Sequence, residues 1–205
     1  CTYLPSAYYE PIGFEHVPKK QGDYYCSVGY EKCNGQQFLD EALLLCLKAE
    51  LDVTGSNMEV CPGQAEIQIC SKNIKAADDS VILKYILHRL GEKYRYKIDF
   101  SAKPIKGDWN GSGCHVNFST QQMRNDNGLE IIYKAIDKLK LKHLEHIEIY
   151  GDDNIDRLTG LHETSDINLF TFGVADRSAS IRIPKNTEEE NKGYFEDRRP
   201  SSSAD

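Results

Sequence analysis

The chain has 205 residues, of which 40% are hydrophobic and 28% are charged, values typical of a globular protein of about one domain. Its 25 Lys and Arg against 32 Asp and Glu give a net charge of −7, which argues against a generic nucleic-acid binder, because phosphate binding needs a basic face. No apolar run approaches the ~20 residues that cross a bilayer, so we expect no membrane partner.

Three segments carry hydrophobic residues at helical spacing. The first 25 residues, rich in Tyr, Pro and Gly, predict an extended or loop-like lead-in. Residues 36–50, 76–94 and 128–147 then repeat apolar positions at i, i+3 and i+4, which predicts three amphipathic helices.

Four short segments alternate apolar and polar residues instead, which predicts strands at 65–69, 114–119, 178–183 and 194–198. Helices and strands that mix without a strict β-α-β order predict an α+β fold, with helices packed on one face of a mainly antiparallel sheet. We expect the charged run from 185 to 192 to be an exposed loop and the three serines at 201–203 to form a frayed end.

The seven cysteines are irregularly spaced and form no C-x-x-C pair. Their odd number argues against a disulfide framework or a zinc knuckle and favours free thiols in a reducing cytosol. Residues 1–5 lack the basic and apolar regions of a signal peptide. We therefore expect a cytoplasmic protein.

The predicted strands sort their residues onto two faces, because successive side chains of a strand point in opposite directions. If the strands lie in one sheet, one face collects charged side chains, namely Glu66, His115, Arg182, Glu196 and Arg198. One interpretation is the solvent face of a half-buried sheet. The other is a site for metal and phosphate, because carboxylates and imidazole bind divalent cations and Arg binds phosphate or carboxylate oxygens.

Five longer motifs are more specific than this alternation. They lie at residues 57–66 (NMEVCPGQAE), 103–115 (KPIKGDWNGSGCH), 157–164 (RLTGLHET), 177–184 (RSASIRIP) and 193–200 (GYFEDRRP). In order and spacing they resemble glutamine synthetases of the eukaryotic type.

This resemblance extends from about residue 21 to residue 200 and implies the curved, mainly antiparallel sheet of that family's catalytic domain. Residues 1–205 would form part of this domain, without the family's small N-terminal domain and its C-terminal helical end. The parent protein would be a homo-oligomeric ring.

The implied activity is ATP-dependent ligation of ammonia to the γ-carboxylate of glutamate through γ-glutamyl phosphate. Such chemistry brings anions together and needs cations to neutralise them. On the family pattern, Glu59 and Glu66 would bind one Mg²⁺ or Mn²⁺, and His115 and Glu196 would bind a second.

The resemblance also implies roles for other residues. Glu163 would close over the intermediate and help to deprotonate ammonium, while Arg177 and Arg182 would stabilise the transferring phosphate. The glutamate substrate would contact Asp108, Trp109, Asn110, Gly111, Arg157 and Arg198. ATP would contact Glu66, Asn117, Ser119, Arg177, Arg182 and Tyr194.

Other residues are given no catalytic role. We expect His88, His143 and His146 to lie on helix surfaces, Arg199 to form a structural ion pair, and Cys114 to be a small buried hydrophobic residue.

The match is incomplete. The family's first acidic pair, two glutamates one residue apart on a strand, is not found, and Ala65 and Asp176 stand where the family usually has Trp and Asn. Three interpretations stay open: part of a working glutamine synthetase, an inactive structural relative that keeps the fold, or another carboxylate–amine ligase of related fold. We expect the isolated chain to have little or no activity.

Overall fold

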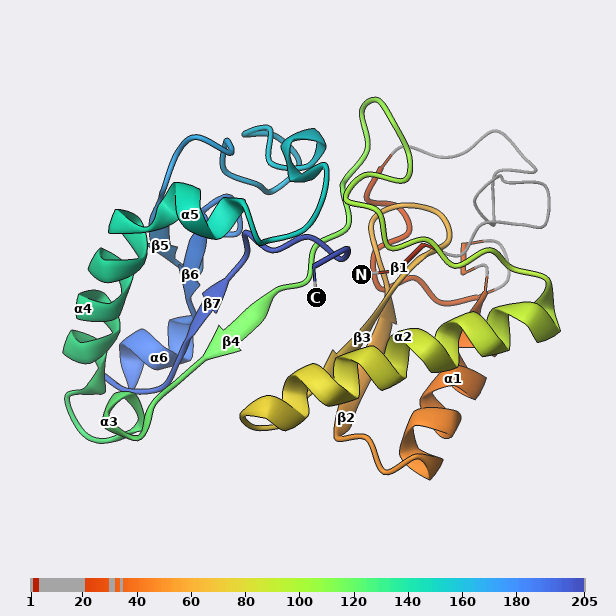
Figure 1. Ribbon diagram of the computed structural model, residues 1–205, viewed down its shortest axis with the longest axis horizontal. Helices are drawn as coiled ribbons and strands as arrows, with labels where there is room; N and C mark the ends of the chain where they lie inside the picture. Colours follow the sequence, from red (N-terminus) through yellow and green to blue (C-terminus); the bar gives the residue numbers. More distant parts are fainter. Residues whose placement is uncertain (1, 4–20, 30–31, 34, 205) are drawn as a thin grey trace. The chain divides into compact units, whose positions relative to one another are not determined.

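The computed structural model describes residues 2–3, 21–29, 32–33 and 35–204 (Figure 1). These residues form two compact units, one up to Phe100 and the other Ser101–Ala204. Most of the predicted lead-in lies outside the described residues. Within the described part, none of the helices combines the length and the apolar character needed to cross a membrane.

The first unit is a three-stranded antiparallel sheet covered by two helices. The strand order is β1-β3-β2, with β1 at Thr2–Tyr3, β2 at Val53–Met58 and β3 at Gln64–Ile69. Helices α1 (Gln36–Lys48) and α2 (Ile74–Tyr94) contribute apolar side chains to the same core as Met58 and Ala65 of the sheet. One face of this sheet is therefore occupied by the core.

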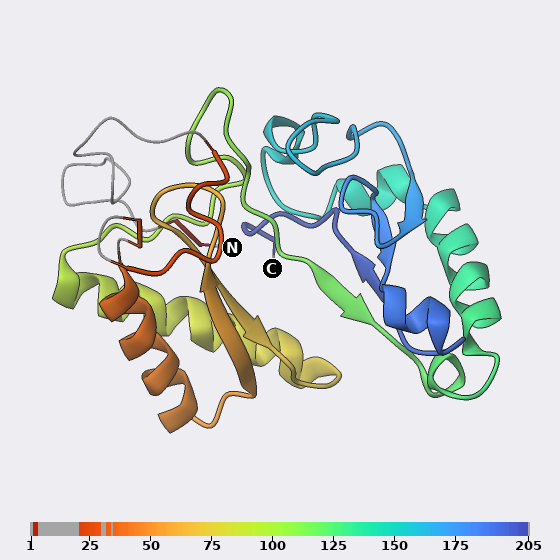
Figure 2. The ribbon, with the colours of Figure 1, turned by 180° about the vertical axis from the view of Figure 1, so that it is seen from behind.

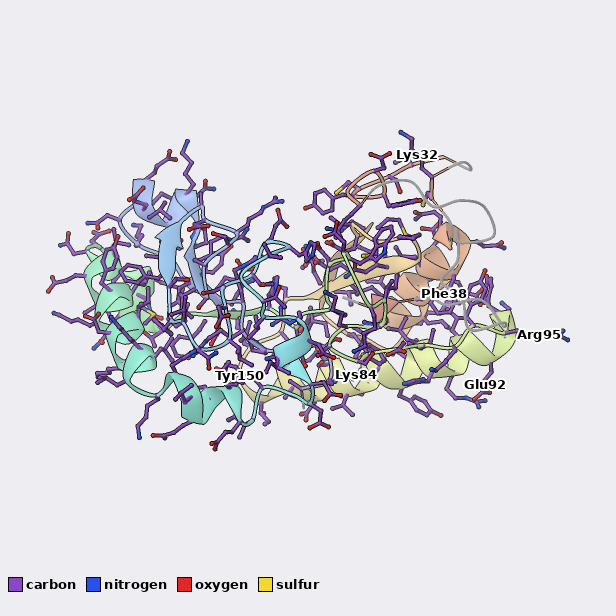
Figure 3. All side chains as sticks on the ribbon, turned by 90° about the horizontal axis from the view of Figure 1, so that it is seen from above. Lys32, Phe38, Lys84, Glu92, Arg95 and Tyr150 are labelled. Carbon is purple, nitrogen blue, oxygen red and sulfur yellow. The ribbon has the colours of Figure 1, made fainter. Side chains whose placement is uncertain are left out.

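Aromatic rings fill the end of this core. Phe38 of α1, labelled in Figure 3, is 1% exposed, and its ring centroid lies 5.5 Å from Tyr94 and 5.6 Å from Tyr96. Burial of such rings and of the Leu residues of α2 stabilises the two helices against the sheet.

The second unit carries a four-stranded mixed sheet. Its order is β4-β7-β6-β5, and only the β5–β6 pair is parallel. The strands are β4 (Val116–Phe118), β5 (Phe172–Val174), β6 (Ile181–Ile183) and β7 (Phe195–Asp197).

Helix α4 (Gly128–Leu141) lies along one face of this sheet, as Figure 2 shows from behind. Its Ile132 and Ile136 pack with Ile181, Ile183 and Phe195 in a second core. The shorter helices are α3 (Gln121–Arg124), α5 (His143–Ile147), η1 (Asn154–Asp156) and α6 (Lys185–Glu189).

The α+β class is confirmed, and the helices expected at 36–50 and 76–94 are α1 and α2. The hydrogen bonds divide the strands into two sheets instead of the single sheet expected. The helix expected at 128–147 is two helices, because Lys142 has φ −112° and ψ 18°, outside the helical range.

Two expectations about loops were wrong. The run 185–192 begins with the short helix α6, entered through Pro184, whose fixed φ suits the residue before a first turn. The serines at the end are not frayed. Ser201 and Ser202 are buried, and their amides donate to the carbonyl oxygens of Tyr150 and Ser112.

Candidate functional site

In the first unit, a pair of carboxylates lies on the sheet face opposite the core. Glu66 of β3 faces Asn57 of β2 across the hairpin, and Glu59 follows β2, its amide donating to the carbonyl oxygen of Gln64 at 2.8 Å. Directly paired residues of antiparallel strands share a face, whereas the neighbouring pair Met58 and Ala65 enters the core. Glu59 and Glu66 are therefore held near each other by the hairpin register.

The surroundings of Glu59 favour its neutral form. Burial, followed by the negative charge of Glu66, raises the pKa of Glu59 to about 7. Asn57 Nδ2 and the Val60 amide donate to its two oxygens at 3.2 and 3.3 Å but do not compensate for these effects. A cation bound by both carboxylates would remove the repulsion, so the pair has the chemistry of half a metal site.

In the second unit, a row of polar side chains crosses three strands. Glu196 of β7 is paired with Asn117 of β4 on one side and with Arg182 of β6 on the other. The row lies on the face opposite the apolar core formed by Ile181, Ile183 and Phe195. Four of the five charged residues predicted to share one face therefore do so here: His115, Arg182, Glu196 and Arg198. The fifth, Glu66, belongs to the other sheet.

Glu196 is the centre of this row. Its side chain is buried, and its Oε1 lies 3.1 Å from His115 Nδ1 and 3.2 Å from Arg198 Nη1, while Oε2 lies 2.5 Å from Arg182 Nε. Burial opposes ionisation, but the hydrogen bond from His115 and the two arginines outweigh it and lower the pKa of Glu196 to about 2.

His115 is suited to binding a metal ion. Loss of water around its ring, partly opposed by the hydrogen bond to Glu196, lowers the pKa of His115 to about 4. The ring is therefore neutral at pH 7, as a metal-binding imidazole must be. The neutral ring donates from Nδ1 to Glu196 Oε1 at 3.1 Å, so its lone pair for a cation is on Nε2.

One buried polar atom in this row, Arg198 Nε, has no hydrogen-bond partner among the described residues. Glu196 Oε2 and Arg182 Nε make no other hydrogen bond, but they contact each other as an ion pair at 2.5 Å. Unsatisfied buried groups are costly and rare, and they are typical of sites completed by a ligand or an ion. Here the free capacity is one guanidinium donor, Arg198 Nε, which matches an oxyanion.

The two candidate half-sites are the pair Glu59 and Glu66 in the first unit and the pair His115 and Glu196 in the second. Neither pair is a complete metal site. Within the part of the chain that the structure describes, no three His, Cys, Asp or Glu side chains converge in a way that could hold a metal ion. Each half supplies two candidate ligands, and the first acidic pair expected from the family pattern is not found in the sequence.

Glu163 lies in a strained loop beside two arginines. His162 and Glu163 have φ values of 54° and 59°, a region that residues other than glycine rarely adopt. Glu163 Oε1 lies 3.8 Å from Arg177 Nη1, and its carbonyl oxygen accepts from Arg198 Nη2 at 3.4 Å. Thr164 closes the loop by donating to the carbonyl oxygens of Arg157 and Leu161.

Arg157 is fixed by the backbone of the segment that follows β7. Its guanidinium is buried and Nη2 donates to the carbonyl oxygens of Arg198, Arg199 and Pro200 at 2.6–3.1 Å. Burial, followed by the nearby charge of Arg198, lowers the pKa of Arg157 to about 10. Arg157 therefore positions the residues at 198–200 in this structure.

The segment 108–111 approaches Arg157 closely. A Cβ atom on Gly111 would lie 2.2 Å from Arg157 Cγ and 2.7 Å from the carbonyl oxygen of Ala102, so only glycine fits there. Asp108 is exposed, and its Oδ1 lies 3.2 Å from His162 Nε2 in the Glu163 loop. The next two residues of this segment, Trp109 and Asn110, are half-buried.

Of the residues predicted to contact ATP, Asn117 and Tyr194 are exposed, and Ser119 Oγ donates to the carbonyl oxygen of Gly193 at 2.6 Å. This hydrogen bond holds the end of β4 to the start of β7. Cys114, expected to be buried, is only half-buried.

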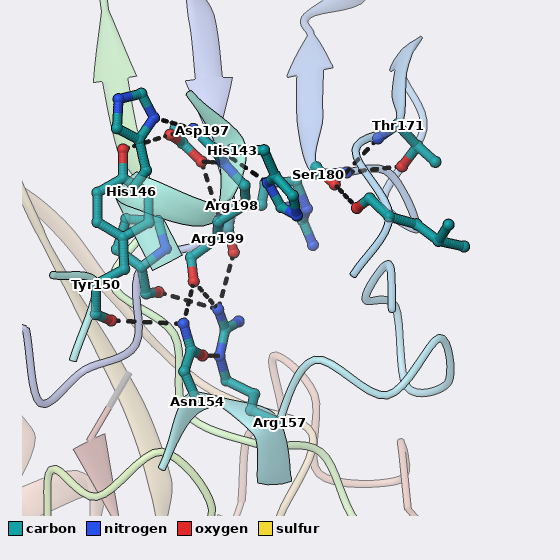
Figure 4. A network of polar contacts seen from close by, with 12 residues as sticks. His143, His146, Tyr150, Asn154, Arg157, Thr171, Ser180, Asp197, Arg198 and Arg199 are labelled. Carbon is teal, nitrogen blue, oxygen red and sulfur yellow. Dashed lines mark hydrogen bonds and ion pairs between the residues drawn. The ribbon is translucent and has the colours of Figure 1, made fainter. Parts of the chain in front are cut away.

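A buried network behind the row was not anticipated from the sequence (Figure 4). Arg199 forms the expected ion pair, with its Nη2 2.6 Å from Asp197 Oδ2. His143, expected on a helix surface, is instead buried and lies 3.1 Å from Arg199 Nη1. That expectation was wrong because α5 directs this ring toward β7, which no local pattern indicates.

The chain is thus an α+β protein whose two sheets carry carboxylates, an imidazole and arginines on the faces opposite their cores. Residues 5–142 match the family model described as "Glutamine synthetase, catalytic domain". The chain therefore belongs to the glutamine synthetase family.

Curated relatives match nearly the whole chain. It is 50% identical over 196 residues to a glutamine synthetase cytosolic isozyme of Pinus sylvestris, covering 95% of this chain and 54% of the relative. It is 50% identical over 207 residues to glutamine synthetase cytosolic isozyme 2 of Vitis vinifera, covering 100% and 58%. A putative glutamine synthetase of Acanthamoeba polyphaga mimivirus is 49% identical over 197 residues, covering 96% and 56%. The chain thus spans a little over half the length of these relatives.

Proposed function

We propose that this chain is part of a glutamate–ammonia ligase that forms glutamine from glutamate, ammonia and ATP in the cytoplasm. The observation that carries the proposal is the buried Glu196, whose two carboxylate oxygens contact His115, Arg182 and Arg198 at 2.5–3.2 Å. Such a centre offers metal ligands and phosphate-binding groups within one row of a sheet.

The two half-sites would hold divalent cations, Mg²⁺ or Mn²⁺. Glu59 and Glu66 would bind one and His115 and Glu196 the other. When bound, the cations would neutralise the phosphate oxygens of ATP and make phosphorylation of a carboxylate feasible. A neutral imidazole and an ionised Glu196 support this binding, because metal ligands must be unprotonated at the atom that binds.

The arginines would bind the anionic substrates. Arg182 and Arg177 would hold the transferring phosphate, and Arg198 and Arg157 would hold glutamate, beside Asp108, Trp109, Asn110 and Gly111. Arg198 has an unused Nε donor for this role, whereas Nη2 of Arg157 is already engaged with three carbonyl oxygens.

Glu163 would accept a proton from ammonium, which is a nucleophile only after deprotonation. Its closeness to Arg177 keeps a carboxylate next to the proposed phosphate-binding group. Asn117, Ser119, Tyr194 and Glu66 would contact ATP. Closure of the Glu163 loop would exclude water, which would otherwise hydrolyse the acyl phosphate.

Calorimetric titration of Mn²⁺ and a non-hydrolysable ATP analogue tests this proposal. The variants are Glu66→Gln and Glu196→Gln, which remove the charge and keep the shape, with the exposed Glu188→Gln as a matched control. We expect metal-dependent nucleotide binding in wild type and control, weakened about tenfold or more in each site variant. No binding to the wild-type chain, or equal binding by all four proteins, would reject the proposed site.

A further inference from the structure

The end of β7 places two ion pairs on opposite faces. Glu196 and Arg198 contact each other at 3.2 Å on the face of the proposed site. Asp197 and Arg199 contact each other on the other face, where Arg199 Nε and Nη2 donate to the two carboxylate oxygens at 2.9 and 2.6 Å. Movement of the second pair would therefore move the first.

Arg199 is enclosed on the side away from the site. It is 1% exposed, and its guanidinium carbon lies 5.1 Å from the Tyr150 ring centre and 5.2 Å from that of Phe170. Figure 4 shows His143 and His146 beside it. Nη1 lies 3.1 Å from His143 Nδ1, and Nη2 lies 3.3 Å from His146 Nδ1.

These two contacts fix the protonation of both rings. A guanidinium can only donate hydrogen bonds, so each Nδ1 must accept with a lone pair. The remaining proton of each neutral ring is then on Nε2, and His143 Nε2 donates to the carbonyl oxygen of Ile167 at 2.8 Å. Protonation of Nδ1 on either ring would replace a hydrogen bond to Arg199 with two facing cations.

We propose that Arg199 is a positioning residue, held by His143 and His146, which keeps Glu196 and Arg198 in place only while His146 is neutral. The inference deepens the proposed function, because Glu196 and Arg198 belong to the proposed site. It makes the geometry of that site depend on pH through His146, a residue outside the proposed site.

The charges around the histidines support this dependence. Partial burial, followed by the charge of Arg199, lowers the pKa of His146, with opposing effects from Asp197 and Glu145. The titratable and charged groups that face the two rings are Arg199, Asp197, Tyr150, Glu145 and the other histidine of the pair.

Nuclear magnetic resonance of the whole chain tests the inference directly. Long-range ¹H–¹⁵N spectra report which ring nitrogen carries the proton. We expect the proton on Nε2 of both rings and a His146 titration midpoint below about 6.5, the ordinary value for histidine. A proton on Nδ1 of either neutral ring would overturn the inference.

The Nε–H resonance of Arg198 reports the other face of the strand. In wild type it should shift with the titration of His146. In His146→Asn it should not, because an Asn oxygen offers an acceptor in place of Nδ1 and does not titrate. The exposed His88→Asn is the matched control and should keep the wild-type pH profile. A profile that is the same in wild type and His146→Asn would also overturn the inference.

Mn²⁺ affinity connects the network to the proposed site. Arg199→Lys loses the planar guanidinium that donates two hydrogen bonds to Asp197. We expect the affinity of this variant for Mn²⁺ to be lower by a factor of about ten or more. Unchanged affinity would count against a positioning role. If wild type itself binds no Mn²⁺, the proposed function fails, while the ring protonation and the Arg198 resonance still decide this inference.

Discussion

Glu59 and Glu196 are carboxylates of the two half-sites, yet their surroundings move their pKa values in opposite directions. Glu59 lies near Glu66 with few donors, and its pKa rises to about 7. Burial also opposes ionisation of Glu196, but a hydrogen bond from His115 and the charges of Arg198 and Arg182 outweigh it, and its pKa falls to about 2. At neutral pH Glu59 is therefore partly protonated and must lose this proton to bind a cation, whereas Glu196 is ionised.

Replacing Glu66 should separate the two causes that act on Glu59. We predict that Glu66→Gln lowers the pKa of Glu59 but leaves it above the usual value of about 4.3, because burial is the larger cause and remains. A pH titration of the Glu59 carboxyl carbon signal measures the shift, with Glu188→Gln as control. A pKa that stays at about 7 would show that Glu66 does not repel it.

The same shift has a consequence for stability. The folded-state pKa of Glu59 lies above that of an unfolded glutamate, so its stabilising contribution is present at low pH and is lost as pH rises toward 7. Glu66→Gln should therefore reduce the loss of unfolding free energy between about pH 4.5 and 7. Denaturant unfolding at these two pH values checks the sign.

Gly111 tests how tightly Arg157 is held. We predict that Gly111→Ala destabilises the second unit by about 1–3 kcal/mol, because the added Cβ would overlap Arg157 Cγ and the Ala102 carbonyl oxygen. Gly55→Ala is the control, since its Cβ would meet only Gln68 Oε1 at 3.8 Å. Equal unfolding midpoints for the two variants would contradict the close approach.

At the scale of elements, Asp79 links the first turns of α2 to the segment that follows strand β3. This carboxylate is nearly inaccessible and contacts Lys75 and Ser71, with the Asp52 amide at 3.4 Å. The ion pair with Lys75 and the hydrogen bond from Ser71 lower the pKa of Asp79. These contacts join α2 to the end of β3, the strand that carries Glu66.

A pH series tests this link. A carboxylate whose folded pKa is depressed stabilises the fold above its unfolded value, about 3.9, and this contribution is lost as pH falls below it. We predict that Asp79→Asn unfolds more readily than wild type at pH 7 and that the difference narrows toward pH 3. Urea unfolding of both proteins at pH 7 and pH 3 measures this difference in the free energy of unfolding. A constant difference would mean that the charge of Asp79 is not the cause.

Periodicity in the sequence predicted α1, α2 and the strands whose inner residues are apolar. It missed β2, because Thr54, Gly55, Ser56 and Asn57 are typical of turns and the strand is stabilised only by its pairing with β3. It also missed the break at Lys142, where no Gly or Pro marks a helix end.

The site was predictable only in part. Motifs named Glu196, His115 and Arg182, and alternation placed them on one face. Their contacts could not be predicted, because pairing of β7 with β4 and β6 joins residues far apart in the chain. The contact between Arg199 and His143 spans 56 positions, and no local rule connects them.

At the scale of the molecule, each unit has a core of its own, and we expect the two to respond separately to a cavity. Ile132 is fully buried, and Ile132→Ala should cost about 2–5 kcal/mol. Native-state hydrogen exchange should show faster exchange in β6 and α4, with α2 unchanged. Leu141→Ala, at an 82% exposed position, is the control. Equal loss of protection in α2 would indicate one cooperative core.

The activity of the chain is expected to depend on parts of the longer relatives. Each half-site has two candidate ligands, and the chain covers 54–58% of the relatives in Pinus and Vitis. We predict little or no ATP- and glutamate-dependent hydroxamate formation by the pure chain. A clear signal that Glu196→Gln abolishes would contradict this. A longer parent chain should assemble as a ring, which light scattering would test.

The sequence Glu196-Asp197-Arg198-Arg199 repeats one charge pattern on both faces of its strand. A slip by one residue would carry each ion pair to the other face of the strand, so the charge pattern within this segment does not by itself set the alignment. Phe195 sets it, because the slip would move this buried ring out of the core and bring in the exposed Tyr194. The burial of Phe195 therefore decides which charged residues of the strand face the proposed site. An insertion or deletion in this segment should disturb the site more than the replacement of any one charged residue.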